Sequence, residues 1–353
     1  MGKINVRSPY FIKLATANLT TAQLEIKIYT GVANTTWTGS IQYTLNSTAV
    51  SAKVNFEISE LVKDYIQTEF NGSFPSTPVD ITEATTINVD YRTTETLSSG
   101  SPVVTTVFGE RAFYGYGYFE EGDNPQLAVT ALQSNTTILQ NNNEVVTIPV
   151  DTTLLSKVEW LFNGSVVLTK TPLSNPTIQD QIQYVQNLNS GAKVNVDSAR
   201  IFPTAGASTI INIIKYEKCK YTPLKLTFIN KFGAYQEIWM FANSILNMNT
   251  SEEKYKSNIL TNGTYNTYDP QIKLLTKNAN QKLTLNSDYY PESYNEIFRQ
   301  LFLSEKVWIE YKGQTLGINI ESKQLTYKTS LTDSLINYTV DVGFAFDTIN
   351  NIR

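Results

Sequence analysis

The sequence contains no histidine and a single cysteine in 353 residues. Histidine is the side chain that most often serves as a general base near neutral pH, so a Ser-His-Asp relay cannot be assembled. One cysteine cannot form a disulfide within the chain, and it falls short of the ligand set of a structural zinc site. These absences exclude most hydrolase mechanisms and the metal centres that depend on histidine or cysteine.

Charged residues are also scarce, at 17% of the chain, against about 25% in ordinary soluble domains. Lysine and arginine number 28 and aspartate and glutamate 32, a net charge of −4 without any block of one sign. A broad basic face for nucleic acid is therefore not expected. Weak charge repulsion between copies and 12% aromatic residues favour assembly, although a compositional bias of the source genome would explain the same figures.

Long apolar runs are absent as well. No stretch approaches the roughly 18 to 20 apolar residues of a membrane span, and residues 1–8 contain no apolar core of a secretory signal. We expect a chain that is made in the cytoplasm and does not span a membrane.

Alternation of apolar and polar residues dominates the first part of the chain. It is clearest over residues 24–29, 41–45 and 86–92, which we predict to be half-buried strands. Residues 59–68 begin with a serine suited to a helix cap and space their apolar side chains like a short helix. We predict an N-terminal β-sandwich domain over residues 1–130.

A tight hairpin marks the second predicted domain, over residues 131–220. Asn163 and Gly164 stand between two apolar runs, and this pair favours the positive φ angles of a two-residue turn. The β-branched run at 209–216 is predicted to be a further strand. We expect a small all-β domain here.

The third predicted domain, residues 221–353, combines strands with one helix. Residues 224–229 and 235–241 are predicted to form a hairpin. Residues 291–303 have a proline near the first helical position and apolar side chains at helical spacing. Further strands are predicted at 307–311, 316–320 and 337–344, with a turn at Lys312 and Gly313. The fold class is therefore mainly β, with several β-sandwich or barrel domains in series.

One aromatic stretch stands out as a candidate interaction surface. Tyr114, Tyr116 and Tyr118 alternate with glycines and are followed by Phe119. On one face of a strand, the tyrosines could stack on sugar rings or dock on a partner protein. Alternatively, they form a ladder packed within their own domain, and the glycines allow close approach of the backbone.

Other candidate sites are weaker. The acidic segment 120–125 could hold a hard cation, but it lacks the ligand ladder of a calcium loop and is better explained as a solvated turn. The remaining carboxylates are scattered, and no glycine-rich fingerprint for nucleotides occurs. Cys219 lies between two lysines, without a partner that would make it a catalytic nucleophile. We therefore predict no catalytic residue, no cofactor, no metal site and no enzymatic activity.

Several segments resemble virion proteins of crAss-like phages of Bacteroidetes, notably their tail or neck ring proteins. The segments are residues 3–10, 113–122, 219–223 and 228–234. The C-terminal part resembles the unit of a helix and a barrel that is common in phage tail-tube and tail-hub proteins, and it comprises residues 291–303, 330–333 and 337–341.

The resemblance implies a structural subunit of the virion, made in the host cytoplasm. It implies a homo-oligomeric ring, twelve-fold in the family, around the DNA channel of a short tail and in contact with the portal and other tail or neck proteins. Genomic DNA would pass without sequence-specific binding, and the acidic balance suits such a channel because it does not neutralise phosphates. Neck ring, tail barrel, hub and baseplate all fit the sequence.

Two other classes of protein remain open. A tail fibre or other receptor-binding or carbohydrate-binding protein would use the tyrosines against glycans, and would be expected to form trimers, often with a repetitive shaft. A cell-surface enzyme module would need a pocket with matched carboxylates. No repetitive shaft is visible in the sequence.

Overall fold

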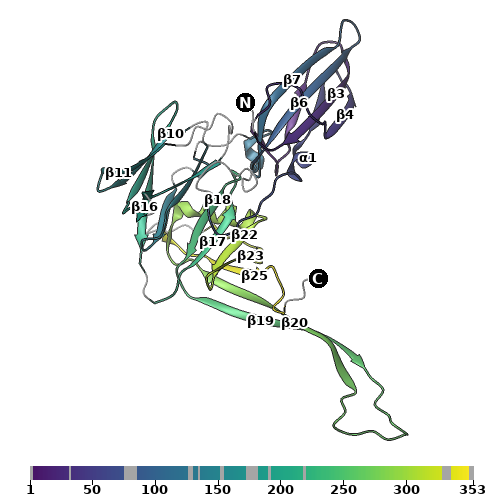
Figure 1. Cartoon of the computed structure of the whole chain (residues 1–353), viewed down its shortest axis with the longest axis vertical. Helices are drawn as coiled ribbons and strands as arrows, with labels where there is room; N and C mark the ends of the chain where they lie inside the picture. Colours follow the sequence, from purple (N-terminus) through teal and green to yellow (C-terminus); the bar gives the residue numbers. More distant parts are fainter. Residues whose placement is uncertain are drawn as a thin grey trace. The chain divides into compact units, whose positions relative to one another are not determined.

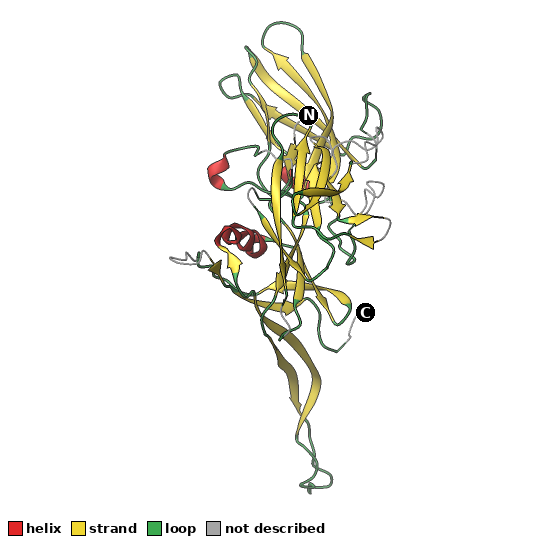
Figure 2. Cartoon of the chain, turned by 90° about the vertical axis from the view of Figure 1, so that its left-hand side faces the viewer, coloured by secondary structure: helices red, strands yellow, loops and turns green. Residues whose placement is uncertain are grey.

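A computed structural model of the chain gives the fold (Figures 1 and 2). The residues that it describes are 3–31, 33–74, 86–125, 130–133, 136–151, 155–171, 182–189, 192–217, 220–327 and 335–349. Strands make up 54% of the chain and helices 7%. The predicted mainly-β class is confirmed, and Cys219 lies outside the described residues.

The chain divides into two compact units. The first contains residues 1–217, 227–239 and 293–304, and the second contains residues 218–226, 240–292 and 305–353. Two segments after residue 220, 227–239 and 293–304, belong with the first unit, and the second of them contains most of the predicted helix. The division into three domains stays a prediction.

The first sheet of the first unit contains a strand over most of each of the three predicted segments, although residues 86–90 are all buried instead of alternating. Its strands, in spatial order, are β1 (Lys3–Asn5), β7 (Val103–Phe113), β6 (Thr86–Leu97), β3 (Leu19–Tyr29) and β4 (Tyr43–Thr48). Within β3, Leu24, Ile26 and Ile28 are buried, as period-2 patterning predicts. The antiparallel strands β2 (Phe11–Leu14) and β5 (Val54–Glu57) form a separate two-stranded sheet.

Helix α1 (Ser59–Lys63) is shorter than the predicted span of 59–68. Beyond it the backbone tightens, because Tyr65 and Ile66 each donate an N–H to the carbonyl three residues earlier. The helix therefore ends in a tight turn instead of continuing to residue 68.

The second sheet of the first unit contains the predicted hairpin. Its strands, in spatial order, are β11 (Ser165–Lys170), β10 (Leu155–Phe162), β15 (Ser198–Pro203), β16 (Thr209–Tyr216) and β8 (Thr137–Asn141). Asn163 and Gly164 have φ of 49° and 75°, so the predicted turn is confirmed. The short pairs are β9 (Thr147–Asp151) with β12 (Ile182–Gln186), and β13 (Leu188–Asn189) with β14 (Ala192–Lys193).

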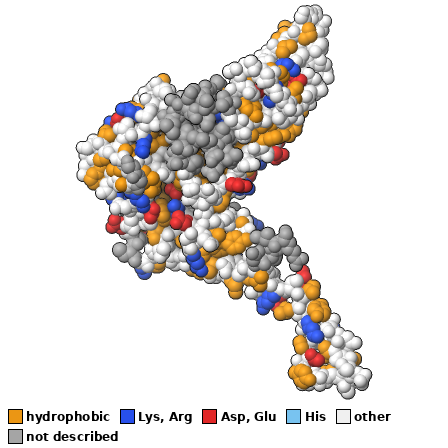
Figure 3. Space-filling model, in the orientation of Figure 1, with side chains coloured by type: hydrophobic (Ala, Val, Ile, Leu, Met, Phe, Trp, Pro, Cys, Tyr) orange, Lys and Arg blue, Asp and Glu red, His pale blue; other side chains and the backbone are white. Residues whose placement is uncertain are grey.

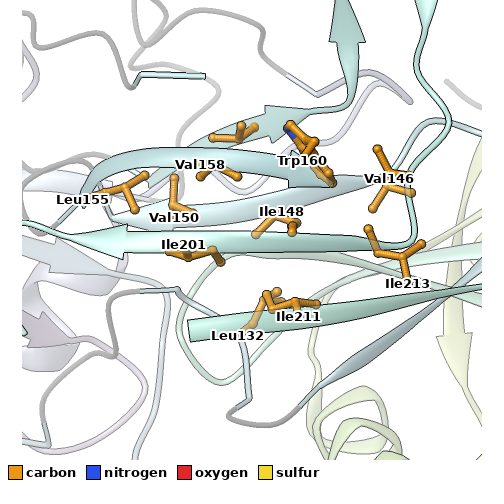
Figure 4. Packing of buried hydrophobic residues seen from close by; sticks show 13 residues of the cluster. Leu132, Val146, Ile148, Val150, Leu155, Val158, Trp160, Ile201, Ile211 and Ile213 are labelled. Atoms are coloured by element: carbon orange, nitrogen blue, oxygen red, sulfur yellow. The ribbon is translucent and has the colours of Figure 1, made fainter. Parts of the chain in front are cut away.

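Buried side chains of this sheet and of the pair β9–β12 form one core cluster around Trp160 (Figure 4). Ile148 and Val150 of β9 and Val158 of β10 are among its fully buried members. Two strand layers therefore share one apolar core, which is how a sandwich is stabilised.

The hairpin strands β17 (Leu224–Ile229) and β18 (Tyr235–Met240) lie where they were predicted. The same holds for the helix predicted at 291–303, which consists of a 3-10 turn (Glu292–Tyr294) and α2 (Asn295–Leu303). Ile297, Phe298 and Leu301 are buried, so α2 packs with the spacing of an amphipathic helix.

In the second unit, five strands of a larger sheet follow one another in the order β22-β23-β25-β20-β19. The strands are β19 (Ser244–Lys256), β20 (Ile272–Asn286), β22 (Val307–Tyr311), β23 (Gln314–Ile320) and β25 (Thr339–Phe344), with a short pair of β21 (Tyr290–Pro291) and β24 (Leu335–Ile336). Lys312 and Gly313 form the predicted turn, with φ of 53° and 76°.

Candidate interaction surfaces

The predicted strand of exposed tyrosines is corrected by the structure. Strand β7 ends at Phe113, before the first of the tyrosines. The side chains of Tyr114 and Tyr116 are only 6% and 8% exposed, so they do not form a displayed face. For these two residues the alternative, packing inside their own domain, describes the structure.

The glycines explain why this segment is buried. A Cβ atom on Gly115 would lie 2.7 Å from Oδ1 of Asn5 and 2.8 Å from the carbonyl oxygen of Lys231. The backbone is fixed on both sides, since Tyr116 donates its N–H to Lys231 and Arg7 donates its N–H to Gly115. Only glycine allows the three stretches of chain to approach so closely.

Arg7 covers the buried tyrosines. Its guanidinium lies 4.8 Å from the ring centre of Tyr116 and 5.8 Å from that of Tyr114, within the range of a cation–π contact. The same group donates a hydrogen bond of 2.8 Å to the carbonyl oxygen of Leu303. Burial, partly opposed by the positive charge of Arg7, raises the pKa of Tyr116 to about 12.

Tyr118 is half-buried and is held from several directions. The Arg299 guanidinium lies 3.6 Å from its ring centre, and the Lys231 ammonium lies 4.3 Å away. Its hydroxyl donates a hydrogen bond to Glu296. Burial and the hydrogen bond to the Glu296 carboxylate raise the pKa of Tyr118 well above its ordinary value. Tyr118 thus fixes the segment that follows it.

That segment, residues 119–123, is here called the Phe119 turn. It begins with a 3-10 helix (Phe119–Glu121), and the Tyr118 N–H donates to Oε2 of Glu121 at 2.9 Å. Glu121 also pairs with Lys231, and Asp123 pairs with Lys13. The turn is therefore anchored at both ends, while the side chain of Phe119 is fully exposed.

Two of the three acidic side chains of the Phe119 turn pair with different lysines. Lysines neutralise Glu121 and Asp123, as expected for a solvated acidic turn. Among the residues that the structure describes, no group of three or more histidine, cysteine, aspartate or glutamate side chains could hold a metal ion. In the same part of the chain, no helix is both long and apolar enough to cross a membrane.

A second surface, which the sequence analysis missed, is a two-stranded ribbon formed by β19 and β20. The strands pair from Ser244 with Leu285 to Lys256 with Ile272. Every residue of β19 is exposed. Figures 1 and 2 show the ribbon extending beyond the other strands of its own unit, and a loop over residues 257–271 closes it.

The ribbon has two unlike faces. Residue pairing places four large, exposed apolar side chains on one face, here called the apolar face: Leu246, Met248, Ile272 and Leu274. At the base of the ribbon, this face continues into the buried Leu283 and Leu285. The opposite face is rich in Asn, Ser and Thr, and its large exposed apolar side chains are Ile245 and Tyr255.

The ribbon also differs in charge from the rest of the chain. Residues 244–286 contain five lysines and three acidic residues, which gives a formal charge of +2. The rest of the chain has a formal charge of −6, and the two together give the net charge of −4. The apolar face holds three of the lysines (Lys254, Lys256 and Lys277) and one acid, Glu252, which pairs with Lys254. Figure 3 shows hydrophobic and basic side chains side by side along the ribbon.

A groove of about 990 Å³ also opens on the second unit. Phe344 and Phe346 line it together with Glu321 and Asp347. The Lys282 ammonium pairs with Glu321 at 2.5 Å, and the Asn278 amide donates to Asp347 at 3.1 Å. Its carboxylates are thus engaged within the unit.

The sequence held one signal for the ribbon. Asn262 and Gly263 take φ of 54° and 81° in the closing loop, the same dipeptide that predicted the hairpin at Asn163 and Gly164.

A comparison with known protein families and with curated proteins finds no match to this chain.

Proposed function

We propose that the chain is a structural subunit of an oligomeric ring in the tail or neck of a short-tailed bacteriophage. The subunit would line or support the channel through which DNA is ejected, and would contact the portal and neighbouring tail proteins. Its place is the virion, after synthesis in the host cytoplasm. The role is structural, without catalysis. The resemblance to phage ring proteins suggests the particle, and the ribbon supports self-assembly.

The ribbon is the single observation that carries the proposal. An isolated two-stranded hairpin is only marginally stable in water. Here β19 is exposed throughout, and four large apolar side chains line one face of the ribbon. Aromatic residues and methionine are enriched at interfaces, and contiguous exposed apolar surface commonly marks a contact site. A ribbon of this kind is suited to docking on another subunit.

The negative net charge of the chain supports the proposed role in a channel through which DNA passes. The chain carries a net charge of −4, so it offers little of the phosphate neutralisation and counterion release that make proteins adhere to DNA. A ring of such subunits would let the duplex slide.

Mass photometry and negative-stain images of the purified protein test the proposal. We expect closed rings of one stoichiometry that form as the protein concentration rises. Monomers at all concentrations, or trimers with the form of a fibre, would contradict it. Localising the chain in purified virions would identify its level in the particle.

A further inference from the structure

We propose that the apolar face of the ribbon in one copy docks on the Phe119 turn of a second copy. The inference rests on the proposed function, because it names the contact that would join neighbouring subunits of the ring. Of the interface residues predicted from the sequence, the proposed contact keeps Phe119. The ribbon takes the place of the tyrosines, which are buried or half-buried.

A closed ring requires two different surfaces on each subunit. Its contacts are heterologous, so that a surface of one copy meets another surface of the next. The ribbon belongs to the second unit and the Phe119 turn to the first. Each copy therefore carries both partners of such a contact.

The chemistry of the two surfaces is complementary. The Phe119 turn presents a fully exposed aromatic ring beside Glu120, which makes no ion pair with any described residue, and Glu121 and Asp123 flank it. The apolar face presents aliphatic side chains together with a formal charge of +2. Apolar contact supplies affinity, and opposite charges steer the encounter and disfavour the wrong register.

The Phe119 turn is held in place by contacts within its own unit. The Phe119 turn is held by the contacts of Tyr118 and by the pairs of Lys231 with Glu121 and of Lys13 with Asp123. Asn124 adds a reciprocal pair of hydrogen bonds with the backbone of Phe11, of 2.8 and 3.0 Å. A rigid aromatic anchor loses little entropy on binding, which makes such residues strong contributors to interfaces.

A complementation experiment tests the contact with full-length chains. The ribbon variant combines Met248→Ser with Leu274→Ser, two residues of the apolar face that are 58% and 51% exposed. The turn variant is Phe119→Ser. The matched control combines Ile245→Ser with Tyr255→Ser, which are 50% and 46% exposed but lie on the opposite face. All of these side chains are exposed, so the variants are expected to fold.

We expect the concentration at the midpoint of assembly to rise by about tenfold or more in the ribbon variant and in the turn variant, and to stay near the wild-type value in the control. When the two variants are mixed, one contact can still form: the intact ribbon of the turn variant can dock on the intact Phe119 turn of the ribbon variant. The mixture should therefore form a one-to-one dimer that neither variant forms alone. Mass photometry measures both quantities.

A charge exchange provides a second measurement. Glu120→Lys alone and Lys256→Glu alone should each weaken assembly, and the two together should recover part of the loss, because the opposite charges meet again.

The outcomes separate the contact from the proposed function. Rings that persist in the ribbon or turn variant overturn the contact and leave the ring subunit standing. A mixture that stays monomeric also overturns the pairing of these two surfaces. Wild-type protein that never assembles contradicts the proposed function and the contact together.

Discussion

The hydroxyl of Tyr118 donates a hydrogen bond to a carboxylate oxygen of Glu296, 178 residues further along the chain. The bond joins the start of the Phe119 turn to helix α2 within the first unit. Because the acceptor is charged, the bond is stronger than one between neutral groups. It is the contact through which a distant helix orients the turn.

Replacing Tyr118 by phenylalanine removes this hydrogen bond and keeps the ring between Arg299 and Lys231. We expect the free energy of unfolding to fall by about 1 to 3 kcal/mol, as for a hydrogen bond to a charged group. Urea denaturation measures the change. The control is Tyr268→Phe, since Tyr268 is 82% exposed and its substitution should have no effect. An unchanged stability for Tyr118→Phe would show that Glu296 does not hold the turn.

Stability should decrease at high pH because of Tyr116. Its pKa is about 12 in the folded chain, against about 10 in an unfolded one. Between these values the unfolded chain releases the phenolic proton while the folded chain keeps it, so stability falls as the pH rises through this window. The loss is about 2 kcal/mol at the folded pKa and approaches about 3 kcal/mol above it.

The measurement is the free energy of unfolding in urea between about pH 9 and about pH 11.5. Tyr116→Phe should show a shallower decline than the wild type, because the titrating group is gone. Equal slopes for the two proteins would contradict the assignment of this effect to Tyr116.

Gly115 should not tolerate a side chain. A Cβ atom there would lie 2.8 Å from a backbone oxygen and 3.1 Å from a backbone carbon of the segment at 231–232, and backbone cannot rotate away. We expect Gly115→Ala to lower the free energy of unfolding by about 2 kcal/mol or more. Gly317→Ala is the matched control, because its nearest new contact is an ordinary 3.8 Å. Thermal melts that rank the two variants equally would refute the close approach.

Limited proteolysis should report whether the ribbon is covered. In the monomer, trypsin should cut first at Lys256 and Lys273, which border the closing loop in a part of the ribbon where most residues are exposed. In the assembled state, cleavage at these lysines should slow. Peptide mapping over a time course detects both effects. First cuts elsewhere in the monomer would contradict an exposed ribbon.

Local chemistry accounts for the elements that could be predicted from sequence. The pair Asn163 and Gly164 fixes its own turn through positive φ angles, and alternation buries Leu24 and Ile26 in β3. The helix at 291–303 was predicted for the same reason, since its apolar spacing is contained within the segment. In each of these elements, the signal that predicts the conformation lies within the segment itself.

The interaction surfaces could not be predicted so directly, because distant residues decide them. Tyr114 and Tyr116 are buried since Gly115 lets the backbone approach Asn5 and Lys231, and nothing near position 115 in the sequence shows this. The ribbon lacks the buried stripe of an ordinary strand, so its apolar residues are diluted by polar ones. Only its turn at Asn262 and Gly263 gave a local signal.

The discontinuity of the first unit has a consequence for synthesis. Tyr294 is buried in this unit and accepts the N–H of Leu139, and Glu296 holds Tyr118. Chains emerge from the ribosome N-terminus first, so the ribbon is made before residues 293–304 arrive to complete the unit. A nascent chain that stops short of α2 lacks the support of its Phe119 turn. Copies that end before α2 should therefore be poor partners in the assembly proposed above.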